Sequence, residues 1–238
     1  MLSQELKKMY DGYYTSGVKR KRILSAIDSV REIQKITRNI TFDNVLDVGS
    51  GDGTVLQELQ NSGITKSLSV AEISDSSIEI IKERKLKSIV EIKQFDGYEI
   101  PYDDKSFDVA MSTYVLEHVE HERMFLKEMA RVSNYVLISV PLENTRAIEK
   151  ALQAGKKIGH INFYTLETFG SILETSGLEI VDIYPYTTSK EYELLCSKKY
   201  GKFKYFIRKT MLSFFPNIAR RHFTYMGIAL CKSKQSNK

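Results

Sequence analysis

The apolar and polar positions along the chain follow two patterns, and each pattern predicts one kind of secondary structure. Seven short, mostly apolar runs predict strands, at residues 44–48, 67–71, 88–95, 107–112, 134–140, 178–184 and 225–231. Apolar residues three or four positions apart predict helices before and between these runs, most clearly at 18–38 and 165–176. Since strands alternate with helices, we expect an α/β fold with a mostly parallel, doubly wound sheet.

The first predicted strand leads directly into a glycine-rich turn, residues 49–53, where every second residue is glycine. Glycine lets the backbone turn sharply and brings its N–H groups close to a ligand. The G-x-G-x-G spacing differs from the G-x-G-x-x-G of dinucleotide-binding folds and disfavours a dehydrogenase. Asp47, two residues before Gly49, would repel a pyrophosphate but suits a ligand that carries an ammonium group. The simpler alternative is an ordinary strand-to-helix turn.

Polar residues also end the later predicted strands, which places Glu72, Asp96 and Ser112 beside Asp47 at one sheet edge. Ligands bind at this edge in doubly wound folds. We expect the Glu72 carboxylate to accept hydrogen bonds from both hydroxyls of a ribose. We expect Asp96 to accept one from the exocyclic amine of adenine. Each of these acids also has the simpler interpretation of a solvated residue at a strand end.

The glycine segment, residues 45–54, resembles motif I of the class I S-adenosylmethionine-dependent methyltransferases. Three later segments, 100–110, 114–119 and 139–141, resemble the family typified by the ubiquinone and menaquinone methyltransferases, and they occur in the same order. The resemblance covers about residues 42–184. It implies a Rossmann-like, seven-stranded sheet whose last strand is antiparallel, with a helical insertion before that strand.

The resemblance implies S-adenosyl-L-methionine as the cofactor and S-adenosyl-L-homocysteine as its product. The residues expected to bind it are Asp47, Gly49, Ser50, Gly51, Glu72, Ile73, Phe95, Asp96, Gly97 and Ser112. We expect one domain over 1–238, in which the core comprises 42–186 and 223–232. A helical lid at 1–40 would precede the core, with Tyr10, Tyr13 and Tyr14 either closing over the donor or packing on the sheet.

In such enzymes the sulfonium already activates the methyl group, so the protein mainly supplies proximity, alignment and desolvation. A base is needed only for a weak nucleophile such as an alcohol. His160 lies in a segment, 158–165, that resembles a G-H-x-x-x-(F/Y)-(S/T) stretch of small-molecule and sugar methyltransferases. We therefore expect His160 first, and His118 second, as the base or substrate ligand. A structural role is the alternative for each histidine.

The segment at 114–118 also bears on a possible metal site. Some relatives place two glutamates and a histidine there as E-x-x-E-H, with a further histidine later in the chain, to bind a divalent cation. Here Tyr114 replaces the first glutamate and leaves Glu117, His118 and His160. Because one carboxylate is missing, we predict no metal.

Charge is distributed unevenly along the chain. The net charge of +5 arises because no acidic residue follows Glu193, while residues 194–238 carry 11 lysines and arginines. The apolar content of 42% and charged content of 27% are typical of a globular protein. No apolar run reaches the ~20 residues of a membrane span, and the start shows no signal-peptide pattern. The two cysteines show no metal or disulfide spacing, so a cytoplasmic location is expected.

The cations concentrate in an expected insertion, residues 187–222, where Phe203, Phe206, Ile207 and Met211 recur at helical spacing. Three interpretations remain open: a lid over an anionic acceptor, a peripheral contact of 198–222 with an anionic membrane, or a grip on nucleic acid, the least favoured. A solvated helix is the simplest alternative.

Together these patterns predict methyl transfer to a small-molecule or glycan acceptor, at oxygen. The alternatives are a quinone-type or lipid-linked acceptor at the membrane surface, the ribose of RNA, and a non-catalytic protein that only binds S-adenosylmethionine.

Overall fold

The computed structural model describes residues 19–143, 149, 153 and 159–233. The strands are β1 (Asn44–Val48), β2 (Ser67–Glu72), β3 (Ile89–Gln94), β4 (Phe107–Thr113), β5 (Ser133–Leu142), β6 (Leu178–Tyr186) and β7 (Tyr225–Ser233). The helices are α2 (Lys19–Ile36), α3 (Thr54–Ser62), α4 (Asp75–Glu83), the 3-10 turn η2 (Leu116–His118), α5 (Glu122–Val132), α7 (Leu166–Thr175), α8 (Lys190–Cys196), α9 (Gly201–Phe214) and α10 (Pro216–His222). The three N-terminal tyrosines lie outside the described residues.

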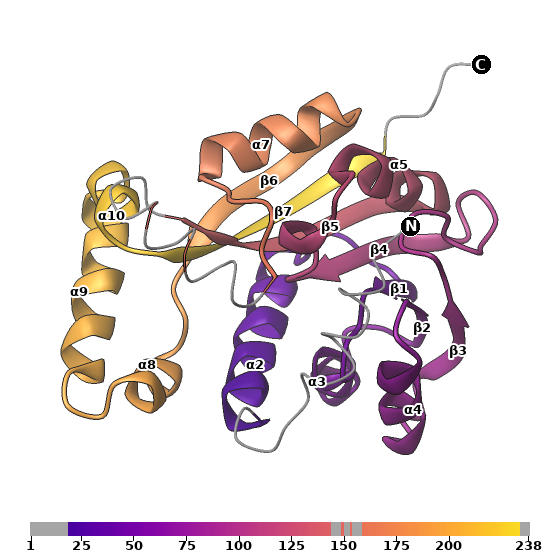
Figure 1. Cartoon of the computed structure of the whole chain (residues 1–238), viewed down its shortest axis with the longest axis horizontal. Coiled ribbons are helices and arrows are strands. Elements are labelled where there is room, and N and C mark those ends of the chain that lie inside the picture. Colours follow the sequence, from indigo (N-terminus) through magenta and orange to yellow (C-terminus); the bar gives the residue numbers. More distant parts are fainter. Residues whose placement is uncertain (1–18, 144–148, 150–152, 154–158, 234–238) are drawn as a thin grey trace.

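One seven-stranded sheet organises these elements, in the order β3-β2-β1-β4-β5-β7-β6 (Figure 1). The pairs from β3 through β5 are parallel, whereas β7 is antiparallel to both β5 and β6. The predicted doubly wound α/β fold and its antiparallel last strand are confirmed.

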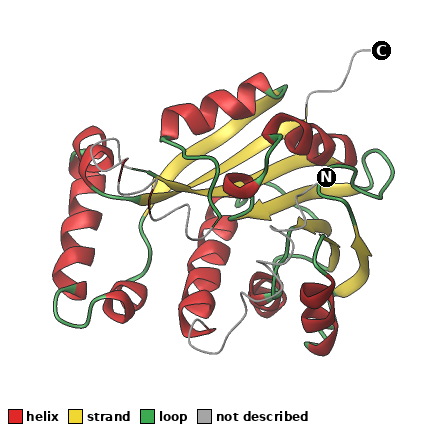
Figure 2. Cartoon of the chain, in the orientation of Figure 1, coloured by secondary structure: helices red, strands yellow, loops and turns green. Residues whose placement is uncertain are grey.

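Helices cover both faces of the sheet, with α2, α3 and α4 on one side and α5 and α7 on the other (Figures 1 and 2). On the first side Ile33, Leu56 and Ile81 are buried in one apolar cluster. On the second side Phe125 and Phe169 belong to the other cluster. Because the central strands are covered twice, their sequences are apolar on both faces, and this explains the uninterrupted apolar runs.

The direction of winding reverses beside β1. The chain proceeds outward from β1 to β2 and β3, and then returns to place β4 on the other side of β1. At such a reversal the two crossover connections diverge and leave a crevice at the carboxyl ends of the strands. The fold therefore puts its ligand-binding crevice at the ends of β1 and β4, directly above the glycine-rich turn.

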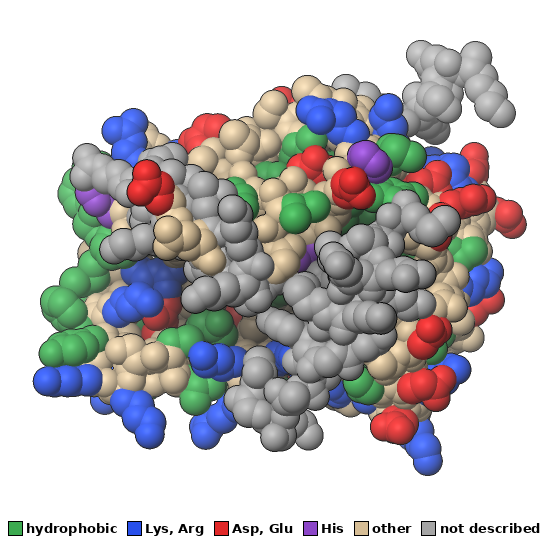
Figure 3. Space-filling view, viewed as in Figure 1, with side chains coloured by type: hydrophobic (Ala, Val, Ile, Leu, Met, Phe, Trp, Pro, Cys, Tyr) green, Lys and Arg blue, Asp and Glu red, His purple; other side chains and the backbone are tan. Residues whose placement is uncertain are grey.

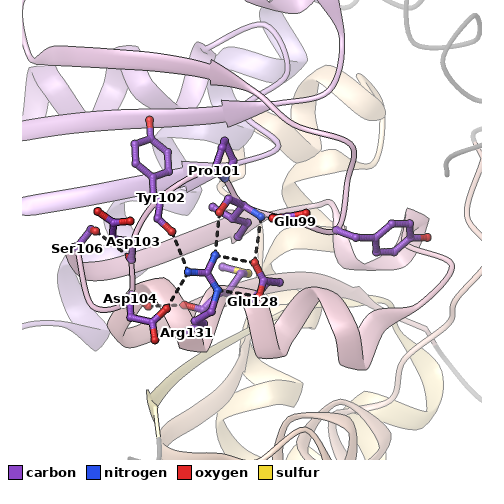
Figure 4. Close-up of polar contacts among 12 residues, drawn as sticks. Glu99, Pro101, Tyr102, Asp103, Asp104, Ser106, Glu128 and Arg131 are labelled. Atoms are coloured by element: carbon purple, nitrogen blue, oxygen red, sulfur yellow. Dashed lines mark hydrogen bonds and ion pairs between the residues drawn. The ribbon is translucent and has the colours of Figure 1, made fainter.

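Arg131 of α5 fixes the loop that leads into β4 (Figure 4). Its guanidinium donates to the carbonyl oxygens of Ile100 and Tyr102, both at 2.8 Å, and pairs with the carboxylates of Glu128 and Asp104 at 2.8 and 2.9 Å. Glu128 in turn accepts a hydrogen bond from the Ile100 N–H at 3.1 Å. This network holds residues 100–104 against α5, and these residues are the first part of the segment 100–110 that resembles the ubiquinone and menaquinone methyltransferases.

Helices α8, α9 and α10 form the insertion between β6 and β7, at one end of the molecule (Figure 1). The predicted helical spacing of its apolar residues is confirmed by α9. Buried Arg208 of α9 connects this helix to α8 and to the start of β7, since it pairs with Glu193 of α8 and donates to the carbonyl oxygen of Thr224. The Tyr225 hydroxyl donates to the Arg208 carbonyl oxygen at 3.0 Å. A side chain at Gly201 would meet the backbone of Glu193, so glycine permits the close approach of α9 to α8.

Candidate active site

The glycine-rich turn after β1 has a backbone conformation that residues with a side chain rarely adopt. Gly49 has a φ of 80°, in the left-handed region, and its N–H donates to the Ala71 carbonyl oxygen at 2.8 Å. A Cβ atom at Gly49 would lie 2.7 Å from a methyl group of Val115. Both the conformation and the space therefore require glycine, as the sequence pattern predicted.

Glu72, at the end of β2, binds the same turn. Its carboxylate accepts from the N–H of Gly51 at 2.8 Å, and from the N–H groups of Ile73 and Ser74 at 2.9 and 3.0 Å. Burial raises the pKa of Glu72, while these hydrogen bonds oppose the rise. The carboxylate is thus held at the crevice between β1 and β2, where it was predicted to bind a ribose.

Asp47 lies beneath the turn with only 1% of its surface exposed. Within the described part of the chain neither of its carboxylate oxygens has a hydrogen-bond partner. Burial raises the pKa of Asp47 to about 7. A nearby positive charge would favour the ionised form, so the ammonium and sulfonium groups of S-adenosylmethionine fit the chemistry of this site.

A cavity of about 650 Å³ opens above these residues. On one side it is lined by the turn, the end of β2 and the segment after β3, with Gly49, Ser50, Gly51, Glu72, Ile73, Phe95 and Gly97. The other side is lined by the segment after β4, His160 and α8, with Tyr114, Glu117, His118, His160, Thr188 and Tyr192. The volume lies within the range of small-molecule sites, ~300–1,000 Å³.

The two candidate histidines meet in this cavity. The rings of His118 and His160 lie 4.8 Å apart in an edge-to-face arrangement. His118 Nδ1 lies 2.9 Å from the carbonyl oxygen of Gly159, and because a carbonyl only accepts, Nδ1 carries the proton of this hydrogen bond. His118 therefore keeps a lone pair on Nε2.

Both imidazoles are held in the neutral form. Burial lowers the pKa of His118. Burial, together with the neighbouring His118, lowers the pKa of His160 to about 4. A neutral imidazole accepts a proton, so both side chains are in the state that a general base needs near pH 7.

Glu117 completes the cluster. It is 1% exposed, its Oε2 atom has no hydrogen-bond partner among the described residues, and burial raises its pKa to about 8. The ligand atoms of Glu117, His118 and His160 all lie within 4.8 Å of one another. Three such groups are able to hold a cation with open positions. The prediction of a metal-free site stays a prediction.

Three of the predicted cofactor residues do not line the cavity. The exposed Asp96 carboxylate accepts from the N–H groups of Tyr98 and Glu99, each at 2.9 Å. The Ser112 hydroxyl donates to the Val48 carbonyl oxygen at 2.9 Å, within the sheet. Asp47 is buried and likewise lies outside the lining of the cavity. The donor contacts expected for Asp47, Asp96 and Ser112 remain predictions.

Several groups that line the cavity or hold its turn were not predicted from the sequence. Lys21, Arg22 and Ser25 of α2 line the cavity, and Arg22 also pairs with Asp52 at 3.3 Å. Arg84 donates to the Asp52 carbonyl oxygen at 2.5 Å and thereby ties α4 to the turn. The basic pattern of α2 was visible in the sequence, but no local signal shows that it faces the crevice.

Tyr114 is a second group whose role was not foreseen. Its φ of 59° is unusual for a residue with a side chain. Its hydroxyl lies 3.0 Å from those of Ser29 and Tyr186, so it connects α2 and β6 beside the cavity. The sequence showed Tyr114 only as the replacement of a potential metal ligand.

Comparison with known proteins places this site in a family. The family described as methyltransferase domain matches residues 18–183, more than half of the chain. The 27-O-demethylrifamycin SV methyltransferase of Amycolatopsis mediterranei is 25% identical over 150 residues, which cover 58% of this chain and 54% of that protein. The demethylmenaquinone methyltransferase of Corynebacterium glutamicum is 34% identical over 92 residues, which cover 38% of this chain and 37% of that protein.

Among solved structures, the [4+2]-cyclase SpnF is similar, with a TM-score of 0.62 and 16% identity over 87% of this chain and 80% of that one. At that identity the likeness concerns the fold alone. The chain spans between 32% and 54% of the lengths of the first curated relatives it matches. From the family match, together with the glycine turn and the relatives, the chain belongs to the methyltransferase-domain family, as a class I methyltransferase whose cofactor is S-adenosyl-L-methionine.

Proposed function

We propose that this protein transfers a methyl group to an oxygen atom of a small-molecule acceptor bound in the cavity. The observation that carries the proposal is the pair of histidines, His118 and His160, whose rings contact each other in the same cavity as the glycine turn. A hydroxyl is a weak nucleophile and needs a base, whereas an amine does not.

Different residues of the chain would bind the donor, accept the proton and exclude water. Glu72 and the turn at 49–51 would contact the donor, which supplies an electrophilic methyl group, and the buried Asp47 carboxylate would act on its positive charge without lining the cavity. His160 accepts the proton of the acceptor hydroxyl. His118, which Gly159 fixes through Nδ1, orients the edge of the His160 ring. Apolar residues such as Phe125 and Val119 exclude water from the same cavity.

The test follows tritium from methyl-labelled S-adenosylmethionine into a small-molecule extract, with the labelled product identified by NMR. We expect an O-methyl product, and we expect His160→Ala to lower turnover by ~10²–10⁴-fold while S-adenosylhomocysteine affinity barely changes. Since the pKa of His160 is about 4, the acid limb of kcat/KM should fall near that pH and not near 6.5.

The matched control is His121→Ala, since His121 is exposed at the start of α5 and does not line the cavity. An N- or C-methylated product, or turnover within a few-fold of wild type in His160→Ala, would refute the assignment of oxygen and base. Tight donor binding without any labelled product would favour the non-catalytic alternative.

A lipid-linked or glycan acceptor is a second candidate, which one observation favours. The basic insertion contributes Tyr192 of α8 to the cavity wall, so an acceptor in the cavity contacts the same insertion that carries the basic and aromatic surface.

A further inference from the structure

Helices α9 and α10 present large apolar side chains to the outside. We call this surface the aromatic face, and its members are Tyr200, Phe203, Phe206, Phe214, Phe215 and Ile218, each at least 50% exposed. They make up more than half of the large exposed hydrophobic residues in the described ranges. Figure 3 shows apolar side chains beside basic ones at the end of the molecule that α9 occupies in Figure 1.

Three phenylalanines of the aromatic face lie along one line of α9. Phe203, Phe206 and Phe214 follow each other at steps of three and eight residues, which place them on one side of an α-helix. Their exposed fractions are 66%, 67% and 74%. Contiguous exposed apolar surface of this kind marks an interaction site more often than isolated apolar residues do.

The opposite side of α9 is firmly anchored. Arg208 is buried and pairs with Glu193, and the Tyr225 hydroxyl binds the carbonyl oxygen of Arg208. Gly201 lets the start of α9 approach α8 closely. The orientation of the helix is therefore set by buried polar contacts, and the phenylalanines point outward as a consequence of that packing.

Lys204 and Arg220 pair with the carboxylates of Glu193 and Glu167, and among the described residues the unpaired charges of α9, α10 and the residues before α9 are basic. Lys198, Lys199, Lys202, Lys209 and Arg221 are exposed and make no ion pair with any residue in the described part of the chain. The sequence has no acidic residue after Glu193. A partner that covers this surface must therefore accept aromatic side chains and offer negative charge.

We propose that the aromatic face is a docking surface for an anionic lipid bilayer. The phenylalanines enter the boundary between headgroups and acyl chains, and the lysines contact lipid phosphates, as basic amphipathic helices do. The helices lie on the membrane, and none in the described residues is long and apolar enough to cross it.

Docking in this manner brings α8, and with it Tyr192 at the cavity wall, next to the bilayer. The docking surface stands apart from the chemistry. Only the further step, that the acceptor is delivered from the membrane, rests on the proposed function.

Vesicle sedimentation tests the proposal with the full chain. We expect the wild-type protein to pellet with phosphatidylcholine vesicles that contain phosphatidylglycerol, to remain in the supernatant with pure phosphatidylcholine, and to be released by high salt. The triple variant Phe203→Ser, Phe206→Ser, Phe214→Ser and the double variant Lys202→Glu, Lys209→Glu should each lose about tenfold or more in partitioning.

Matched controls change equally exposed residues elsewhere. One is Val90→Ser, Met124→Ser, Val181→Ser, and the other is Lys87→Glu, Lys127→Glu. Both should partition like wild type. Calorimetry with S-adenosylhomocysteine should give wild-type affinity in every variant, so that loss of docking is distinguished from loss of the donor site.

Three outcomes would overturn the proposal. The first is a wild-type protein that stays in the supernatant with anionic vesicles. The second is a loss of partitioning in the control variants as large as that in the aromatic variant. The third is a concentration-dependent dimer in analytical ultracentrifugation that the aromatic triple variant abolishes, with no vesicle binding, because a second copy would then cover the face. Circular dichroism checks folding, and the lysine variant keeps the test valid if the aromatic one fails to fold.

Discussion

Replacing Gly49 by alanine isolates the contribution of the glycine turn to donor binding. The new Cβ atom meets two unfavourable conditions, a left-handed φ of 80° and a Val115 methyl group at 2.7 Å. The left-handed backbone costs about 1–2 kcal/mol for a residue with a side chain. Overpacking of this kind costs a further ~1–3 kcal/mol. The turn has to move to relieve the contact.

Gly63→Ala provides the matched control. Gly63 follows the last residue of α3, at the end of the helix away from the turn, and its φ is 64°. A Cβ atom there would meet nothing within 4 Å. Both variants should lose about 1–2 kcal/mol of unfolding free energy from the backbone alone. Only Gly49→Ala carries the additional steric cost.

The assay is calorimetric titration with S-adenosylhomocysteine, with urea denaturation of the same samples. If movement of the turn costs ~1–3 kcal/mol, affinity in Gly49→Ala should fall by about 5- to 150-fold. Gly63→Ala should keep wild-type affinity. Equal affinities in the two variants would refute the reasoning that the turn at Gly49 contacts the donor.

The remaining predictions concern stability and ions. Arg208→Met should lower the unfolding free energy by about 3 kcal/mol in thermal denaturation, because it leaves the buried Glu193 carboxylate without its main partner; a loss under ~1 kcal/mol would contradict this. The pKa of Glu117 is about 8 in the folded chain, against an ordinary value of 4.5 in the unfolded chain. Its contribution to the unfolding free energy is therefore fully present below pH 4.5 and is lost as the pH rises to about 8. Glu117→Gln should flatten that decline in urea denaturation. A chelator should leave methyl transfer unchanged, and inhibition that added metal reverses would point to a cation on Glu117, His118 and His160.

The sheet and the glycine-rich turn were predictable because their signals are local. Uninterrupted apolar runs follow from burial on two faces, and glycine at alternate positions follows from backbone geometry within a few residues. Glu72 was predictable for the same reason, since the end of a parallel strand fixes its place at the sheet edge.

Other features depended on contacts that sequence spacing does not reveal. His118 and His160 were separate candidates, and their ring contact joins residues on either side of β5. The Tyr114 hydroxyl lies within hydrogen-bond distance of those of Ser29 and Tyr186, and its backbone is left-handed. No local sequence pattern predicts either feature.

Asp96 illustrates competition at a strand end. The sequence placed an acid at the end of β3, and the N–H groups of Tyr98 and Glu99 both donate to its Oδ1 atom. Short acidic side chains often bind the backbone of their own turn in this way, and position along the chain does not reveal it. The contact of Asp96 with the adenine amine stays a prediction.

The most direct test of the account is a crystal structure of the protein with S-adenosyl-L-homocysteine. We expect the ligand in the cavity, with its ribose hydroxyls within hydrogen-bond distance of the Glu72 carboxylate and its amino-acid portion against the turn at Gly49 and Gly51. A ligand bound elsewhere on the molecule, or a cavity that stays empty under conditions where calorimetry shows binding, would contradict the assignment of the donor site.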